Sequence, residues 1–343
     1  SHEHADGRVG VKKLTRDQIE LVGLYVICIV IAFVISALLV QFNDGSWRDV
    51  LDAMMNGALR NPGRWGETLR RAAPLLIVAS GSAIAARAGI INIGQEGQLL
   101  VGAAGAAFIL TKINPGSPVM LILGLILGTI AGAVWAGISA LLFYWRRVPI
   151  VLSTLLLVYL SNQAVGYTMT RSSLLLEIVK GSPNRIQNSA KVAPESRLGI
   201  ITLFGNKFPL SVPFAVLFAV GIAYLFARSV WGFRLKMLGM NPRTAQRAGV
   251  SSVYFGTMAL ITSGAAAGLA GSMMLASGQS NYRVSSGFAG GVGWDGLLVA
   301  LVARNNPYAA IPVALAFASL YTGSNFLAAA GVSSVLVDVI RGL

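Results

Sequence analysis

The chain has 343 residues, of which 55% are hydrophobic and only 12% are charged, whereas soluble domains carry about 25% charged residues. This composition excludes an ordinary soluble enzyme and predicts a membrane protein. The net charge of +14 suits anionic lipid at a cytoplasmic membrane face better than nucleic acid, because no basic stripe interleaved with aromatic residues occurs. The single cysteine, Cys28, excludes a disulfide framework and a cysteine metal site.

Six long apolar runs predict membrane spans, because about 20 helical residues cross the hydrocarbon core of a bilayer. They occupy residues 21–40, 119–145, 148–170, 208–227, 248–282 and 305–337, and the last two are long enough to hold a bend or a second segment. Shorter apolar pieces at 72–86, 97–111 and 296–303 are too short to cross alone. We therefore expect an all-α polytopic membrane protein with about ten membrane segments, some of them broken or re-entrant half-helices.

Basic residues in short loops set the orientation, because such loops stay on the cytoplasmic side. They predict a cytoplasmic N-terminal tail over residues 1–20, followed by one transmembrane domain over residues 21–343. On this topology residues 42–71 and 171–207 form external loops, and residues 229–250 form a basic cytoplasmic loop. The loop at 171–207 is longer than a simple connection needs, so it either docks a soluble partner or caps the bundle.

Two polar interruptions in the apolar pattern are similar to each other. The first spans residues 89–98 and the second spans residues 293–296, and each places an acid beside a glycine shortly before a Leu-Leu-Val triplet. On the predicted topology the helices that follow cross in opposite directions, which is what an inverted pseudo-repeat leaves in a sequence. A half-helix that begins inside the membrane exposes unpaired N–H groups and a positive dipole end, where a polar solute or an acid of the protein can bind.

These interruptions supply the candidate substrate pathway. The two acids within them either contact solute or cap their own helices, and ionisable residues at this depth are costly enough to suggest a function. The amides can bond sugar hydroxyls or base edges without adding charge, and the indole can stack on a ring. The candidate residues are Asn92, Gln95, Glu96, Gln98, Trp294 and Asp295.

Other motifs indicate packing or carry no chemistry. Both histidines lie in the N-terminal tail, so the fold offers no histidine for catalysis or for a metal site, and no phosphate-binding loop motif occurs. The Gly-x-Gly-x-x-Gly at 291–296 lacks the preceding strand that dinucleotide binding requires. Glycines spaced by four at 124–132 and at 264–268 predict close helix packing.

The loop at 229–250 predicts two short helices. One covers residues 233–238 and stops at Gly239, and a second starts at Asn241 as N-cap with Pro242 in the first helical position. A capped basic helix of this kind either docks a partner protein or lies on anionic lipid as an amphipathic helix.

The motifs at 92–98, 231–242, 248–250, 293–296 and 304–307 together resemble the permease subunits of bacterial ABC importers for nucleosides and simple sugars, within the branched-chain amino acid permease superfamily. The Asn-Ile-Gly-Gln-Glu-Gly-Gln stretch is more similar to nucleoside-type than to ribose-type members. Trp294 departs from the phenylalanine of that pattern. The resemblance implies that the element at 229–250 couples the permease to an ATPase. The coupling residues would be Gly232, Arg234, Gly239, Asn241, Pro242, Arg243 and Arg247.

The resemblance also implies a function and a set of partners. The chain would be a permease of the bacterial inner membrane, paired with a second permease, cytoplasmic ATP-binding subunits and an external solute-binding protein. ATP and Mg²⁺ would bind to the partner subunits, so the chain itself would be no enzyme and would hold no cofactor or metal. A nucleoside is the expected solute, and a simple sugar is the second possibility. The sequence is also compatible with an ion-coupled carrier that uses Glu96 or Asp295, and with a channel or scaffold.

Overall fold

The structure is a computed structural model that describes residues 64–113, 116–177, 187–203 and 205–329, together with isolated positions before residue 64. The chain divides into two compact units, residues 58–322 and residues 1–57 with 323–343. The first unit holds the helical bundle. The expected N-terminal tail, the span at 21–40 and most of the loop at 42–71 lie outside the described residues.

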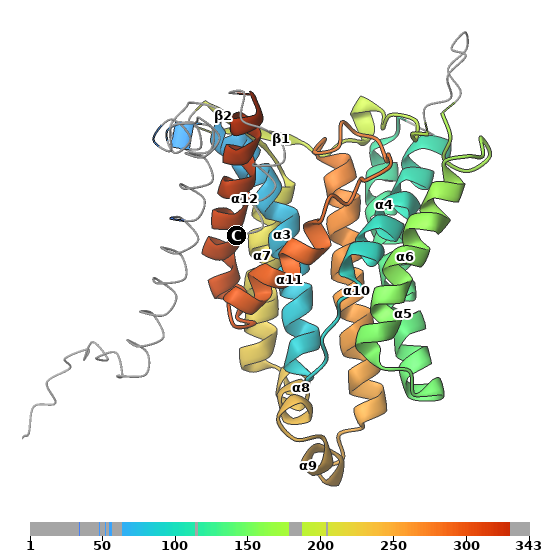
Figure 1. Cartoon of the computed structure of the whole chain (residues 1–343), viewed down its shortest axis with the longest axis vertical. Helices are drawn as coiled ribbons and strands as arrows, with labels where there is room; N and C mark the ends of the chain where they lie inside the picture. Colours follow the sequence, from blue (N-terminus) through green and yellow to red (C-terminus); the bar gives the residue numbers. More distant parts are fainter. Residues whose placement is uncertain are drawn as a thin grey trace, which may run out of the picture. The chain divides into compact units, whose positions relative to one another are not determined.

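The described part of the chain is predominantly helical (Figure 1). Its helices are α3 (Arg64–Arg87), α4 (Gln95–Lys112), α5 (Pro118–Arg146), α6 (Ile150–Thr168), α7 (Ser211–Arg228), α8 (Val230–Met240), α9 (Pro242–Arg247), α10 (Ser252–Ala276), α11 (Val292–Val302) and α12 (Pro307–Ala329), with a 3₁₀ turn at Pro194–Ser196. Among these described helices, α3, α5, α6, α7 and α10 are long and apolar enough to cross a membrane. The total of about ten segments stays a prediction.

Helices α5, α6 and α7 lie within a few residues of the predicted spans. The run at 248–282 forms one continuous helix, α10, without a bend, and its polar end belongs to the connection that follows. The prediction for 72–86 was wrong, because this piece is part of the 24-residue helix α3. The two charged turns that precede it are helical because Glu67 forms ion pairs with Arg70 and Arg71, three and four residues further along.

Helix α10 packs against α3, α4 and α5 through small residues. A Cβ atom on Gly102 would lie 2.4 Å from the Cα of Gly268, and one on Gly132 would lie 2.7 Å from the same atom. No side chain fits at these contacts, so the backbones approach closely, as the glycine spacing predicts. The contacts hold three helices in fixed positions around the polar interruptions.

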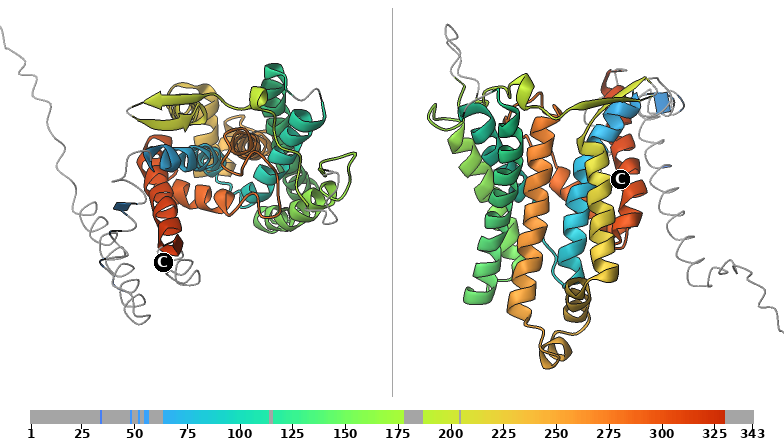
Figure 2. Two further views of the ribbon diagram at one scale, coloured as in Figure 1. Left: turned by 90° about the horizontal axis from the view of Figure 1, so that it is seen from above. Right: turned by 180° about the vertical axis from the view of Figure 1, so that it is seen from behind.

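Helices α4 and α11 both begin in the interior of the bundle and run toward opposite ends (Figures 1 and 2). Their N-terminal turns meet, since a Cβ on Gly293 would lie 2.3 Å from the backbone nitrogen of Glu96. Helix α11 also crosses α3, where a Cβ on Gly296 would lie 2.4 Å from a methyl group of Val78. Opposite directions are what the expected inverted repeat requires, and the repeat itself stays a prediction.

A small antiparallel hairpin interrupts the expected all-α architecture. Strands β1 (Ile200–Leu203) and β2 (Asn206–Pro209) pair from Ile200 with Pro209 to Leu203 with Asn206. Gly205 supplies the positive φ of 76° that the tight turn requires. The hairpin packs on the first turn of α3, and Figure 2 shows it at the end of the unit opposite to α9. We call these two ends the hairpin end and the α9 end.

Candidate functional site

Glu96 joins the N-termini of α4 and α11, the two helices that begin in the interior of the bundle and that we call the half-helices. It lies in the first turn of α4, and its two carboxylate oxygens accept hydrogen bonds from the backbone N–H groups of Gly291, at 2.8 Å, and Gly293, at 2.6 Å. The side chain is 9% exposed. Glu96 therefore caps α11 rather than its own helix, α4, and its negative charge offsets the positive dipole end of α11.

The three predicted pathway amides form one buried network. Asn92 and Gln98 exchange two hydrogen bonds, Nδ2 to Oε1 at 2.9 Å and Nε2 to Oδ1 at 3.1 Å. Gln95 donates from Nε2 to the Val78 carbonyl at 3.2 Å and to Ser263 Oγ at 3.2 Å, and accepts from Ser82 Oγ at 2.5 Å. All three amides are at most 1% exposed. They stabilise the junction of α3, α4 and α10. They do not line either of the two cavities that are described below.

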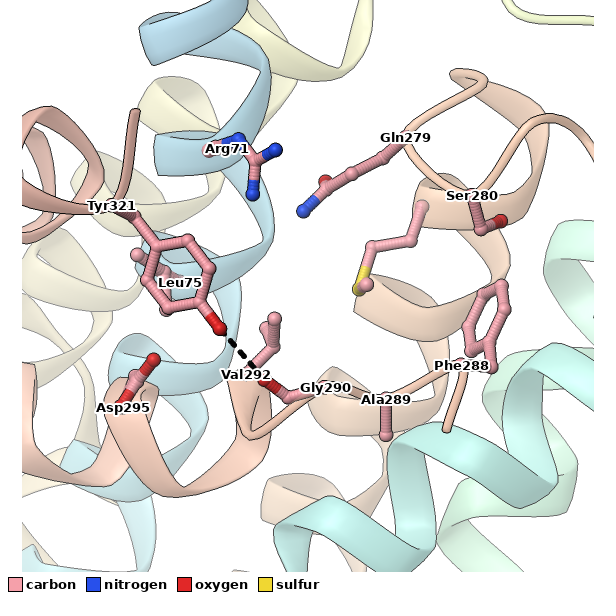
Figure 3. A pocket seen from close by; sticks show the side chains of 11 residues that line it. Arg71, Leu75, Gln279, Ser280, Phe288, Ala289, Gly290, Val292, Asp295 and Tyr321 are labelled. Atoms are coloured by element: carbon pink, nitrogen blue, oxygen red, sulfur yellow. Dashed lines mark hydrogen bonds between the residues drawn. The ribbon is translucent and has the colours of Figure 1, made fainter. Parts of the chain in front are cut away.

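A polar cavity of about 140 Å³ is lined by residues of α3, α10, α11, α12 and the connection before α11 (Figure 3). It lies toward the hairpin end, since Arg71 belongs to the second turn of α3. Its polar residues are Arg71, Gln279, Ser280, Asp295 and Tyr321, and its apolar wall includes Leu75, Met274, Phe288 and Val292. Asp295 is thus the one predicted pathway residue that lines the cavity. Trp294 is half-buried on α11 beside it and does not line it.

Sequence reasoning missed the other polar residues of this cavity. Arg71 lies in a charged stretch assigned to a loop, and Gln279 and Ser280 lie inside an apolar run assigned to a span. The available signal was the polar end of that run, where residues with hydrogen-bonding side chains follow Ala276 and a turn begins. Tyr321 carried no local signal, because its neighbours in α12 are those of an ordinary apolar helix.

A second cavity is apolar. It has a volume of about 660 Å³, lies between α5 and α7, and has Leu269 and Met273 of α10 at its base. Among the described residues that line it, only Thr129 carries a polar side-chain atom, a hydroxyl that donates to the Leu125 carbonyl at 2.7 Å. This groove suits hydrocarbon and offers a polar solute no partner.

At the α9 end, α8 and α9 form the predicted pair of short helices. The Asn241 side chain accepts from the N–H groups of Arg243 and Thr244, both at 3.1 Å, and Pro242 occupies the first position of α9, which confirms the predicted cap. Helix α8 is longer than predicted, at Val230–Met240, because Ser229 caps it by accepting from Gly232 N–H at 3.0 Å.

The predicted coupling residues fall into two groups. Gly232 and Gly239 are contact positions, since a Cβ on Gly232 would lie 2.5 Å from the Leu225 carbonyl and one on Gly239 would lie 2.4 Å from the Arg87 carbonyl. They hold α8 against α7 and α3. The exposed group is Arg234, whose guanidinium lies 5.6 Å from the centre of the Phe255 ring, with Asn241, Pro242, Arg243 and Arg247 around α9.

Comparison with known proteins gives a family match and several similar permeases. The family model described as the branched-chain amino acid transport system permease component matches residues 66–343. The guanosine ABC transporter permease protein NupP of Bacillus subtilis is 30% identical over 92% of this chain and 89% of its own length. The glucose ABC transporter permease protein TsgB13 of Haloferax volcanii is 29% identical over 81% of this chain and 73% of its own length.

The nucleoside ABC transporter permease protein NupB of Lactococcus lactis is 24% identical over 80% of this chain and 76% of its own length. No solved structure gives a significant match. The family model covers the half-helices, the buried amide network, the polar cavity and the α8–α9 pair. The chain therefore belongs to the family of branched-chain amino acid transport system permease components.

Proposed function

We propose that this chain is a permease subunit of an ATP-driven ABC importer that carries a nucleoside across the bacterial inner membrane by alternating access. The observation that carries the proposal is the similarity to NupP, a guanosine permease, over nearly the whole chain. The buried half-helices and the polar cavity beside them support it, because a polar solute needs hydrogen-bonding groups inside an apolar bundle.

The importer contains two different permeases in this proposal. NupP and NupQ, two guanosine permease proteins of Bacillus subtilis, are both similar to this chain, at 30% and 24% identity. Cytoplasmic subunits bind and hydrolyse ATP with Mg²⁺, an external protein delivers the solute, and this chain carries neither cofactor nor enzyme activity. The N-terminus and the α9 end then face the cytoplasm, and the hairpin end faces outward.

The α8–α9 pair transmits ATPase closure to the bundle. Its outer surface is basic and exposed at Arg243 and Arg247, while its inner surface is fixed by the contacts of Gly232 and Gly239. A rigid attachment on one side and an exposed, capped helix on the other are what a mechanical coupling element needs. A force on α9 reaches α3 and α7 through these contacts.

A simple sugar is the second candidate solute, and the similarity to the glucose permease TsgB13 favours it. The test begins with gentle extraction of the chain from its native membrane and identification of the proteins that accompany it by mass spectrometry. We expect an ATP-binding subunit and a second permease. Guanosine or glucose, added with the solute-binding protein, should then stimulate ATP hydrolysis. A chain recovered alone that accumulates solute in an ion gradient would contradict the proposal and favour an ion-coupled carrier.

Charge reversal tests the coupling element. Arg243→Glu with Arg247→Glu should abolish solute-stimulated ATP hydrolysis and uptake while the permease stays folded, because both side chains are exposed. Arg171→Glu is the matched control, since Arg171 is exposed near the opposite end, just after α6. Uptake and stimulation at normal levels in the double variant would contradict the assignment.

A further inference from the structure

The polar cavity contains hydrogen-bonding atoms that the described protein leaves unsatisfied. Gln279 Oε1 and Ser280 Oγ are both buried and have no hydrogen-bond partner. Figure 3 shows the Gln279 amide extending toward Arg71 across the cavity. A buried polar atom without a partner is costly, and native proteins keep few of them outside sites that bind something. The two atoms therefore point to a ligand that donates hydrogen bonds.

The charges around the cavity select a neutral ligand. Arg71 donates from Nε to Glu67 at 3.0 Å, which Arg70 shares, and its guanidinium lies 5.3 Å from the centre of the Tyr321 ring. The charged side chains of the cavity lining are Arg71 and Asp295, whose formal charges sum to zero. The N–H groups of Gly291 and Gly293 bond Glu96, so the start of α11 offers no anion site. Asp295 adds a carboxylate to the lining, which disfavours an anionic ligand further.

The size and the walls of the cavity suit a ligand that consists of a single ring. Its volume of about 140 Å³ is below the roughly 300–1,000 Å³ of pockets that enclose a whole drug-sized ligand. Leu75, Val292 and Phe288 form an apolar wall that can cover the C–H face of a ring. Asp295, Gln279 and Ser280 supply acceptors for hydroxyl protons, and the Arg71 guanidinium supplies donors for hydroxyl oxygens.

We propose that this cavity is a subsite for a neutral polyhydroxylated ring, the sugar moiety of the transported solute. The inference rests on the proposed function and adds which part of the solute the chain binds. The ring belongs either to the ribose of a nucleoside or to a free sugar. The cavity lies on the hairpin side of the junction between α4 and α11, so a solute from that end meets the subsite before the half-helices.

Tyr321 holds the cavity closed on one side. Its hydroxyl donates to the Gly290 carbonyl at 3.2 Å, which ties α12 to the segment that enters α11. Arg71 stacks on the same ring from α3. Helix α3, the segment that enters α11, and α12 thus meet at one tyrosine of the cavity lining.

Thiol protection in the assembled importer tests the subsite directly. Cys28 is the only cysteine of the chain, so Ser280→Cys on a Cys28→Ala background places a single thiol in the cavity wall. The rate of modification by methyl methanethiosulfonate is measured without ATP, in the presence of guanosine, guanine, ribose or glucose. We expect at least about tenfold slower modification with guanosine or with a free sugar. We expect no protection by guanine, which lacks the sugar ring.

The four compounds distinguish a nucleoside ribose from a free sugar as the ring that binds. Protection by guanosine supports a nucleoside ribose, and protection by ribose or glucose alone supports a free sugar. Equal protection by guanine and guanosine would overturn the proposal, because the cavity would then bind the base. No protection by any of the four compounds would overturn it as well. The modification rate does not depend on transport, so failure of the proposed importer function, seen as missing ATP-driven uptake by the unmodified complex, is distinguishable.

A second measurement changes two polar residues of the cavity lining, the unsatisfied amide of Gln279 and the carboxylate of Asp295. Gln279→Ala and Asp295→Asn should each raise the guanosine or sugar concentration for half-maximal uptake about tenfold while the maximal rate is retained. Gln187→Ala is the matched control, because Gln187 is an exposed glutamine outside the cavity, in the segment that pairs with the connection after α10. Unchanged half-saturation in both cavity variants would overturn the proposal.

Discussion

The carboxylate of Glu96 in α4 accepts a hydrogen bond from the backbone N–H of Gly293 in α11, with 2.6 Å between Oε2 and the nitrogen, so one side chain joins the first turns of the two half-helices. Two helix N-termini that meet inside a bundle would repel through their dipoles and leave N–H groups unpaired. A negative charge placed between them removes both problems. The bonds to Glu96 occupy the N–H groups of Gly291 and Gly293, so in the proposed subsite the solute would bind to side chains instead.

Removal of the Glu96 charge should destabilise the permease. We expect Glu96→Gln to lower the unfolding free energy by about 2–3 kcal/mol and Glu96→Ala by more, because hydrogen bonds to a charged group contribute about 1.5–3 kcal/mol each. Denaturant titration in mixed micelles measures the change. Glu195→Gln, at an exposed acid, should stay within about 0.5 kcal/mol of the unmodified chain. Equal stability of Glu96→Ala and the control would contradict the capping role.

The contact between the half-helices leaves no room for a side chain. Gly293→Ala should destabilise the chain by about 1–3 kcal/mol, since the added Cβ would lie 2.3 Å from the backbone nitrogen of Glu96. Gly221→Ala in α7 is the matched control, because nothing lies within 4 Å of a Cβ there, and it should be neutral or stabilising by up to about 1 kcal/mol. Both are compared in the same micelle titration, and equal effects would show that α4 and α11 are not in contact.

Local chemistry made some elements predictable. Asn241 followed by Pro242 specifies a helix start within three residues, so the sequence predicts α9 without knowledge of the fold. The apolar spans α5, α6 and α7 are long enough to be recognised one by one. Helix α3 was missed because Glu67, Arg70 and Arg71 indicate a polar loop by composition, although their spacing of three and four residues is that of helical ion pairs.

Features that join distant segments could not be predicted in the same way. The sequence places an acid at the start of α4, and whether Glu96 caps α4 or α11 depends on how two segments 195 residues apart meet. The cavity needs Arg71, Gln279 and Tyr321 from three elements, and none of them stands out locally. Asn92 and Gln98 looked like solute ligands because their types suit one, whereas the fold satisfies each with the other.

The exchange of hydrogen bonds between Asn92 and Gln98 should appear as energetic coupling. Asn92→Ala leaves the buried Gln98 amide unpaired, at a cost of about 1–3 kcal/mol per unsatisfied group. Gln98→Ala removes two hydrogen bonds of Asn92, which keeps those to Ser263 and to the Gly94 N–H. The double variant Asn92→Ala with Gln98→Ala should cost less than the sum of the single variants by about 0.5–3 kcal/mol. A double-mutant cycle on unfolding free energy measures this difference. Strictly additive losses would contradict the pairing and favour the prediction that both amides bind solute.

The N-cap of α9, Asn241, leads to a prediction about coupling. Asn241→Ala removes the acceptor for two N–H groups, which costs about 1 kcal/mol and lowers the equilibrium ratio of helical to unwound α9 roughly fivefold. Asn241→Ser keeps an N-cap acceptor. We therefore expect Asn241→Ala to reduce solute-stimulated ATP hydrolysis and uptake several-fold and Asn241→Ser to stay near the unmodified level. Both variants should stay folded, because the loss of unfolding free energy in Asn241→Ala is only about 1 kcal/mol and Asn241 is exposed at the α9 end. Equal activity of the two variants would mean that the partner subunit recognises this segment without requiring a preformed helix.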